Sequence, residues 1–345
     1  MSSTSPGYAI TIRVDGSPAS QPVAEVTNAI TAAGASITAL DVVESTLDKV
    51  VIDVACDAID ADHAERITSA ISEVKDLNVR KVSDRTFLLH LGGKIEVTAK
   101  VPLKTRDDLS RAYTPGVARI SQAIANDPSD ARRLTIKRNT VAVVTDGSAV
   151  LGLGNIGPAA ALPVMEGKAA LFKRFADVDA WPVCLDTQDV DEIVRTVQII
   201  APVYGGINLE DISAPRCFEV EARLRELLDI PVFHDDQHGT AIVVLAALRN
   251  ALKFVKKDLA TSKVVMSGAG AAGTAVANLL RTAGATSIFA YDKDGPVDKS
   301  HPATLADAMA GADIFIGVSA GNVLSEAAVA SMAPDSIVFA LANPD

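Results

Sequence analysis

The chain has 345 residues and a mass of 35.9 kDa, which corresponds to about two or three domains of ordinary size. Its 32 basic and 43 acidic residues give a net charge of −11, which argues against a nucleic-acid partner, because such proteins present a basic surface to the phosphates. No apolar run approaches the ~18 residues of a membrane span, the first seven residues show no secretion signal, and the three separated cysteines fit a reducing cytoplasm, so we expect a cytoplasmic protein.

The N-terminal quarter of the chain has the pattern of a small α/β domain. Alternating residues predict strands, and apolar residues at helical spacing predict helices between them. The pattern predicts strands over 8–14, 37–44, 50–55 and 77–82, a helix over 23–33 that ends at Gly34, and a helix capped by Asp60. The resulting order βαββαβ is typical of a ferredoxin-like domain.

This βαββαβ unit resembles an ACT domain, a regulatory module that often binds amino acids at an interface between two copies. The resemblance implies that residues 1–84 form an ACT-like regulatory domain with a small-molecule effector. The candidate effector site is the loop Asp15–Ser20, which opens the first helix and would offer free N–H groups. A spacer or dimerisation domain without any ligand is the alternative.

The rest of the chain divides by its composition. Residues 84–99 are interpreted as a connector with Gly92 and Gly93 as its flexible point, and loop-rich segments dense in Gly, Pro, Asp and Asn follow. Binding and catalytic groups tend to lie in loops of this kind. From Gly239 an apolar helix and an α/β alternation run to the end. We therefore expect a catalytic α/β domain over 85–238 and a Rossmann domain over 239–345.

The motif Gly-x-Gly-x-x-Gly occurs twice, and only its second copy has the context of a dinucleotide site. A buried-strand pattern over 263–267 leads into that copy, and a helix is predicted over 274–280, so the helix N-terminus would face the pyrophosphate. The first copy, over 152–157, is followed directly by Pro158 and is interpreted as a substrate-site loop. The predicted cofactor-binding residues are Gly268, Ala269, Gly270, Ala271, Ala272 and Gly273.

A second predicted strand, over 287–291, ends on Asp292 at roughly the spacing of the acid that binds the ribose in such domains. A carboxylate there pairs with a 2′-hydroxyl and repels a 2′-phosphate, which favours NAD. Lys293 beside it keeps NADP open.

Four carboxylates form two adjacent pairs, Glu210–Asp211 and Asp235–Asp236. Their mutual repulsion would be relieved by a hard divalent ion such as Mg²⁺ or Mn²⁺. Neighbouring residues of a strand point to opposite faces, so each pair could bind one ion only from a turn or a strand end. Solvated or helix-capping acids are the alternative, and the spacing alone leaves both open.

Over residues 92–345 the sequence resembles the bacterial malic enzymes of the small-subunit type. The segments that carry the resemblance are Ala112-Tyr-Thr-Pro-Gly-Val, Val143-Val-Thr-Asp-Gly, Leu151-Gly-Leu-Gly-Asn-Ile-Gly-Pro, Val164-Met-Glu-Gly-Lys, Gly206-Ile-Asn-Leu-Glu-Asp and Phe233-His-Asp-Asp-Gln-His-Gly-Thr-Ala. The family oxidatively decarboxylates L-malate to pyruvate and CO₂ with NAD(P)⁺ and a divalent metal. The resemblance therefore implies this activity, with NAD and Mg²⁺ or Mn²⁺ as cofactors.

The resemblance also implies the roles of individual residues. The family's metal ligands correspond to Glu210, Asp211 and Asp236, and a malate-contacting asparagine corresponds to Asn343. Its tyrosine acid corresponds to Tyr113 and its lysine base to Lys168, both of which contact the substrate. His234 and His238 are interpreted as capping or supporting groups.

These roles are chemically sensible. A lysine acts as a base near neutral pH only if its pKa falls from about 10.4 to about 7–8, which burial and a nearby cation can provide. A tyrosine, with an ordinary pKa of about 10, can protonate the enolate that decarboxylation leaves.

The chain also departs from the family pattern. Larger malic enzymes place a substrate-binding arginine before the Leu-Gly-Leu-Gly loop, and Ser148–Val150 contain none. The family continues past Asn343-Pro344 with another substrate asparagine, so we expect an incomplete Rossmann domain. Malolactic decarboxylation to lactate and a catalytically disabled metabolite sensor are the alternative functions. Both modules pair two-fold in their families, so a homodimer is expected.

Overall fold

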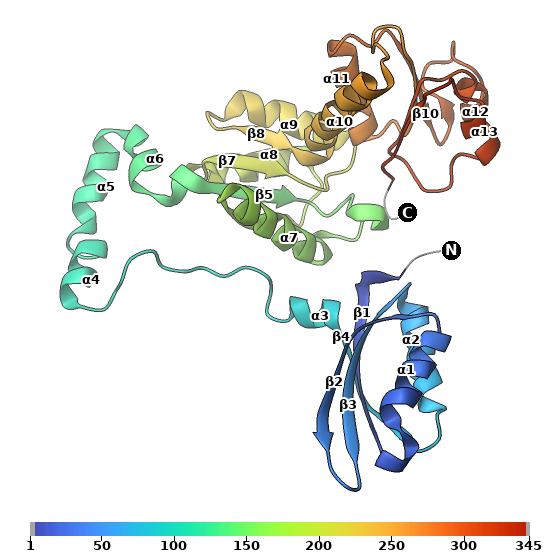
Figure 1. The fold of residues 1–345 in the computed structure, drawn as a ribbon. Helices are drawn as coiled ribbons and strands as arrows, with labels where there is room; N and C mark the ends of the chain where they lie inside the picture. Colours follow the sequence, from blue (N-terminus) through green and yellow to red (C-terminus); the bar gives the residue numbers. More distant parts are fainter. Residues whose placement is uncertain (1–3, 343–345) are drawn as a thin grey trace. The chain divides into compact units, whose positions relative to one another are not determined.

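The structure, a computed structural model, describes residues 4–342 and divides into two compact units, Met1–Glu96 and Val97–Asp345 (Figure 1). The first unit contains one antiparallel sheet, and the second contains two sheets that are mainly parallel. The sequence-based division at residue 239 coincides with the end of a short turn between the two parallel sheets of the second unit.

The first unit has the element order that the sequence predicts. Its elements are β1 (Ser5–Gly16), α1 (Pro22–Ala32), β2 (Ser36–Ser45), β3 (Val50–Ala58), α2 (Ala61–Ser72) and β4 (Leu77–Asp84). The strands pair antiparallel in the order β2-β3-β1-β4, and both helices cover one face of the sheet (Figure 1). As predicted, Asp60 caps α2, with its carboxylate accepting a hydrogen bond of 2.7 Å from the His63 amide.

One sequence-based expectation for this unit is wrong, and one segment has more structure than the sequence analysis described. The amides of Ala19, Ser20 and Gln21 all donate hydrogen bonds within their own loop, so the stretch before α1 does not offer the free N–H groups that were expected of it. The connector begins as a helix, α3 (Arg85–His90), because the Asp84 carboxylate accepts from the amides of its first turn.

The second unit begins with an arm of short helices and continues with a parallel sheet. The arm comprises α4 (Arg106–Ala112), α5 (Val117–Asn126) and α6 (Ala131–Leu134). The sheet comprises β5 (Thr140–Thr145), β6 (Asp179–Cys184), β7 (Gly206–Leu209) and β8 (Val232–His234), in the order β6-β5-β7-β8. One face is covered by α7 (Pro158–Ala176), and the other by α8 (Val190–Ile200) and α9 (Arg216–Leu227) (Figure 1).

The last sheet has the order β11-β10-β9-β12-β13, parallel except for β11 at its edge. Its elements are α10 (Thr240–Val255), β9 (Lys263–Ser267), α11 (Ala271–Thr282), β10 (Ser287–Asp292), β11 (Gly295–Pro296), α12 (Leu305–Met309), β12 (Ile314–Gly317), α13 (Glu326–Ala330) and β13 (Ile337–Ala340). Short 3₁₀ turns lie at Pro18–Ser20, Pro128–Asp130, Ile136–Asn139, Leu151–Leu153 and Ala201–Val203.

The stretch Asp235–Val255 is long and apolar enough to cross a membrane by length and composition alone. One face of α10 packs into the core of the last sheet through Val244, Leu248 and Leu252. Such a core helix passes the same test, so the stretch carries little weight as a membrane span.

In the first unit, Asp15 is a buried carboxylate at the end of β1. It accepts a hydrogen bond of 2.6 Å from Arg80, and the Lys49 ammonium lies 3.8 Å away. The hydrogen bond from Arg80 lowers the pKa of Asp15 and outweighs the opposing effect of burial. A depressed pKa means that the ionised carboxylate stabilises the fold.

We therefore expect Asp15→Asn to destabilise residues 1–96, which have a core of their own, by about 1–2 kcal/mol at pH 7 in urea unfolding. The stabilisation is complete above the unfolded pKa of about 3.9 and is lost as the pH falls through the lower folded pKa. The difference between wild type and variant should therefore shrink only in that acidic range. Asp53→Asn, which breaks the more exposed pair with Arg13 on the same sheet, is the control and should cost less. Equal losses for both would contradict the prediction.

Candidate active site

The candidate site lies at the carboxyl ends of β7 and β8. Glu210 and Asp211 follow β7 directly, and Asp235 and Asp236 follow β8. Because β7 and β8 are adjacent parallel strands, their carboxyl ends meet at one edge of the sheet. Two acidic pairs that are separate in the sequence are thereby brought together.

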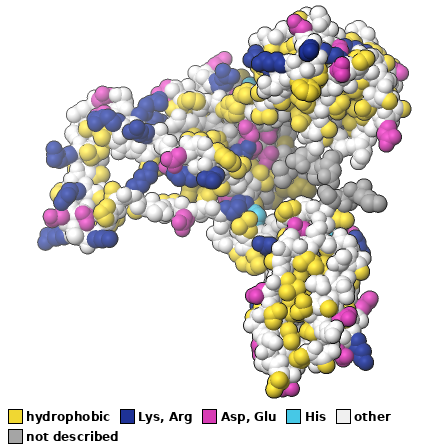
Figure 2. All heavy atoms as spheres, in the orientation of Figure 1, with side chains coloured by type: hydrophobic (Ala, Val, Ile, Leu, Met, Phe, Trp, Pro, Cys, Tyr) yellow, Lys and Arg dark blue, Asp and Glu magenta, His cyan; other side chains and the backbone are white. Residues whose placement is uncertain are grey.

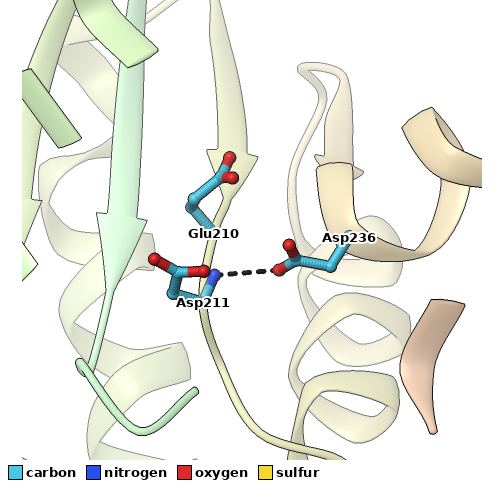
Figure 3. A group of neighbouring side chains, drawn as sticks. All are labelled: Glu210, Asp211 and Asp236. Carbon is cyan, nitrogen blue, oxygen red and sulfur yellow. Dashed lines mark hydrogen bonds between the residues drawn. The ribbon is translucent and has the colours of Figure 1, made fainter. Parts of the chain in front are cut away.

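Three of the four acids form one group. Glu210, Asp211 and Asp236 each offer a carboxylate oxygen within 4.8 Å of the others (Figure 3). The Asp211 amide also donates a hydrogen bond of 2.9 Å to Asp236 Oδ2. Asp211 has a φ of 54°, in the left-handed region, so the chain turns just past the strand end and both neighbouring carboxylates can serve one site. This satisfies the geometric condition that the sequence analysis set for a shared ion.

Glu210 is a buried acid of this group, and its environment disfavours the charged form. Its side chain is almost fully buried, and one oxygen accepts a hydrogen bond of 2.9 Å from Asn208. Burial, with a further contribution from the charge of Asp236, raises the pKa of Glu210 to about 8. Three carboxylate oxygens in a buried site are the ligand set of hard divalent cations, so the residues present fit Mg²⁺ or Mn²⁺.

Lys168 lies beside this acidic group. It projects from the middle of α7, and its Nζ lies 2.6 Å from Asp235 Oδ2 and 3.1 Å from Glu210 Oε1. Burial acts to lower the pKa of Lys168, but the attraction of Glu210 and Asp235 outweighs it, so the pKa is raised. The lowered pKa expected from the sequence is therefore not found, because the two carboxylates stabilise the charged ammonium more than burial destabilises it.

Asp235 is bound to Lys168 and is not part of the three-carboxylate group. The turn that carries it, Asp235–Gly239, is π-helical, and its last residue must be small. A Cβ on Gly239 would lie 2.3 Å from Asp235 Oδ1, so glycine there leaves room for the carboxylate to fold back over the turn. Neither Asp235 nor Asp236 caps the following helix, which was the structural alternative for both.

The structure places the predicted dinucleotide motif between β9 and α11. Strand β9 runs directly into Gly268, whose φ is 111°, and α11 begins at Ala271 rather than at residue 274. A Cβ on Gly273 would lie 1.9 Å from the Gly268 carbonyl oxygen, so the strand and the helix approach so closely that only glycine fits. Asp292 ends β10, the neighbouring parallel strand, and is exposed there. This is the strand–turn–helix arrangement that binds a pyrophosphate.

One predicted substrate residue, Tyr113, lies apart from this site. Tyr113 follows the end of α4 on the arm and is 70% exposed, and α4 and α5 lie away from α7, the helix that carries Lys168 (Figure 1). The sequence could not predict the position of Tyr113, because a motif identifies candidate residues but contains no information on how a helical arm packs. Asn343 lies outside the residues that the structure describes.

The structure also contains a buried group that the sequence analysis missed. Glu221 lies in α9, and His238 Nε2 is 2.7 Å and 2.9 Å from its two carboxylate oxygens. A signal was present, because Glu221 falls at helical spacing among Cys217, Val220 and Leu224, which form the buried face of α9. His238 thus supports the site through Glu221, and buried His234 lies with Nδ1 3.8 Å from Asp236 Oδ2.

Comparison with known protein families agrees with this arrangement. Residues 92–225 match the family described as malic enzyme, N-terminal domain, and residues 237–297 match malic enzyme, NAD binding domain. The first match includes Lys168, Glu210 and Asp211, and the second includes the whole glycine motif and Asp292.

One similar protein matches nearly the whole chain, and others match about three quarters of it. An NAD-dependent malic enzyme of Geobacillus stearothermophilus is 53% identical over 354 residues, which cover 97% of this chain and 74% of that protein. A bifunctional malic/malolactic enzyme of Bacillus subtilis is 50% identical and covers 76% of this chain and 70% of its own length. An NADP-dependent malic enzyme of Rhizobium meliloti is 49% identical over 73% of this chain and 36% of that protein.

The fold agrees with solved structures as well. The crystal structure of NAD-dependent malic enzyme from Thermotoga maritima superposes with a TM-score of 0.72 at 46% sequence identity, covering 76% of this chain and 75% of that chain. A malic enzyme from Entamoeba histolytica superposes with a TM-score of 0.71 at 38% identity, covering 74% of this chain and 59% of that chain. The chain therefore belongs to the malic enzyme family.

Proposed function

We propose that this protein oxidatively decarboxylates L-malate to pyruvate and CO₂, with NAD⁺ or NADP⁺ as oxidant and Mg²⁺ or Mn²⁺ as cofactor. The observation that carries the proposal is Lys168, held by Asp235 and Glu210 at the edge of a three-carboxylate group. A base can take the hydroxyl proton of a 2-hydroxy acid while its carbon loses hydride, and a cation at the same place acidifies that hydroxyl and stabilises the enolate left by decarboxylation. The chain belongs to a family whose members have this activity in their names.

The metal and the dinucleotide would bind at separate sites on the protein. Glu210, Asp211 and Asp236 would hold the divalent cation, which when bound supplies Lewis-acid polarisation of the C2 oxygen and offsets the acids that now raise the pKa of Lys168. Residues 268–273 would hold the pyrophosphate of NAD(P), which supplies the hydride acceptor. Asp292 favours NAD, since a carboxylate repels a 2′-phosphate.

Lys168 is the proposed base. Its ammonium is already directed at the acidic group by Asp235, so the side chain needs no reorientation to reach a hydroxyl bound there. In the protonated state it also stabilises the charge that develops on the substrate. Asp235 would keep Lys168 in place while the proton moves.

Tyr113 is the proposed acid that returns a proton to the carbon after CO₂ has left. The arm carries Tyr113 away from Lys168 of its own chain, and it also bears exposed apolar side chains such as Leu109 and Ile120 (Figure 2). We propose that the protein is a homodimer in which the arm packs on the second copy, so that Tyr113 completes the site of the partner. A dimer would bury such apolar side chains, and it would explain why Tyr113, the proposed acid, is exposed in the single chain.

We further propose that residues 1–84 are an ACT-like, ferredoxin-like regulatory domain, followed by a catalytic domain over 85–238 and a Rossmann domain over 239–345. The βαββαβ order and the sheet order β2-β3-β1-β4 support the first part. The effector would bind near Asp15, one of whose oxygens is buried without a hydrogen-bond partner among the described residues. A buried carboxylate suits the ammonium group of an amino acid.

The protein would be a cytoplasmic malic enzyme of the bacterial small-subunit type. The absence of an arginine in Ser148–Val150 supports the bacterial small-subunit type. The free thiols Cys56, Cys184 and Cys217 support a cytoplasmic location, where thiols stay reduced. Malolactic decarboxylation is the second candidate, because the B. subtilis relative is named for both reactions.

Malate turnover tests the proposed reaction directly. We expect L-malate, Mn²⁺ and NAD⁺ to give NADH and pyruvate in equal amounts, with NADP⁺ reduced more slowly because of Asp292, and EDTA to abolish the reaction. The absorbance of the reduced nicotinamide and the yield of pyruvate are measured on these 345 residues and on a chain continued with the family's next segment. Lactate without net NADH would instead support the malolactic reaction, and malate binding without any turnover would support a sensor.

Mixed dimers test the roles of Lys168 and Tyr113. Lys168→Ala and Tyr113→Phe should each lower kcat by about 10²–10⁴-fold, because each removes a proton-transfer group, while NAD⁺ binding is unchanged. When the two variants are unfolded together and refolded, half of the dimers combine both, and each of these has one complete site. About a quarter of the wild-type activity should therefore return. Each variant refolded alone is the control, and a mixture as inactive as the controls would show that Tyr113 does not act in the partner's site.

Thermal denaturation tests the regulatory domain. We expect one or more amino acids to raise the melting temperature of residues 1–96, because a ligand that binds only the folded state stabilises it. Asp15→Asn should abolish this increase, whereas Asp53→Asn should leave it unchanged. No increase with any amino acid would favour a domain without a ligand.

A further inference from the structure

We propose that Glu221 is a positioning residue of the metal site, which acts through His238 and Gln237 to fix the turn that carries Asp235 and Asp236. The inference rests on the proposed function, because it concerns the same site. Nothing in the sequence motif singles out Glu221, which lies in α9, away from the acidic pairs in sequence.

Glu221 forms hydrogen bonds with the later residues of the turn Asp235–Gly239. Its side chain is buried, His238 Nε2 lies 2.7 Å and 2.9 Å from its two oxygens, and Gln237 Nε2 donates at 3.3 Å. A carboxylate accepts hydrogen bonds and an imidazole N–H donates one, so both contacts fit a hydrogen bond from His238 Nε2 to Glu221. The His238 ring also lies against Phe233, with the ring centroids 5.5 Å apart.

The first two residues of the same turn bond toward Lys168 and the three-carboxylate group. Asp235 bonds to Lys168 at 2.6 Å, and Asp236 accepts from the Asp211 amide at 2.9 Å. Two consecutive side chains of the turn thus bond to the site, and the next two bond to Glu221. Because the turn has only five residues, a displacement of His238 is passed through one or two peptide units to Asp236. Glu221 therefore sets where the metal-ligating oxygen of Asp236 lies.

The space behind the turn explains why a carboxylate is needed there. A cavity of about 550 Å³ adjoins Glu221, Gln237 and His238, and its walls come from α9, the turn, α10 and α11. Without Glu221, His238 and Gln237 would face this cavity with no side chain to hold them. Groups that orient metal ligands in this way typically contribute a factor of about 10–100 to metal affinity. The cavity also leaves a path by which a small carboxylate can reach the position of the missing side chain.

The test measures Mn²⁺ affinity by electron paramagnetic resonance on the full chain. We expect Glu221→Ala to weaken Mn²⁺ binding by about 10–100-fold, and Glu221→Gln, which keeps one accepting oxygen, to weaken it less. Formate added to Glu221→Ala should restore much of the affinity by occupying the vacated position, and NAD⁺ affinity should stay unchanged in all variants. Glu219→Ala is the matched control, since Glu219 lies on the same helix and pairs with Arg223 at the surface, and this variant should bind Mn²⁺ as the wild type does.

The outcomes separate this inference from the proposed function. Wild-type Mn²⁺ affinity in Glu221→Ala would overturn the positioning role while leaving the proposed reaction intact. Equal losses in both Glu221 variants with no effect of formate would overturn it as well, since that is the pattern of general structural damage. A wild-type chain that binds no Mn²⁺ at its three carboxylates would overturn the proposed function and, with it, the role of Glu221.

Discussion

The repulsion between four carboxylates at one edge of a sheet is the constraint on which the rest of the site depends. Glu210, Asp211, Asp235 and Asp236 are brought together because β7 and β8 are adjacent and parallel. Burial makes this repulsion costly, as the raised pKa of Glu210 indicates. Lys168 supplies a cation of the chain's own there, and Glu210, Asp211 and Asp236 each offer a carboxylate oxygen within 4.8 Å of the others. In the proposed reaction, the Lys168 ammonium and a bound divalent ion would together compensate this acidic cluster, which would couple base and Lewis acid.

Holding Lys168 against that cluster depends on close backbone approaches. Lys168 stands in the middle of α7, so its position is set by where that helix begins. A Cβ on Gly147 would lie 2.3 Å from the carbonyl carbon of Gly157, which immediately precedes α7. The loop after β5 therefore lies directly against the start of the helix, and only a glycine permits the contact. At Gly239 a Cβ would instead meet the Asp235 carboxylate at 2.3 Å, so a larger residue there would displace the side chain that bonds to Lys168.

The sequence predicts those parts of the molecule that local patterns encode. The order βαββαβ follows from alternation and capping, and the strand leading into Gly268 follows from a buried apolar run, so both are predicted nearly to their ends. The sequence shows the two acidic pairs as pairs. It does not show that Asp235 bonds to Lys168, whereas Asp236 joins the three-carboxylate group. That division depends on a π-helical turn, which has no sequence signature of its own. The position of Tyr113 depends on how the arm packs, and a motif contains no such information.

The turn after β8 lies between the acids of the site and the buried carboxylate of Glu221, and its geometry explains why a carboxylate stands at position 221. An apolar residue at position 221 would fill the same space without the cost of burying a carboxylate. It would not, however, fix the rotation of the turn, because apolar contacts are non-directional, whereas the bonds from His238 and Gln237 have defined angles and lengths. Metal ligation tolerates little displacement of an oxygen, so direction matters more here than burial. The buried Glu221 therefore contributes to the geometry of the site rather than to the stability of the fold.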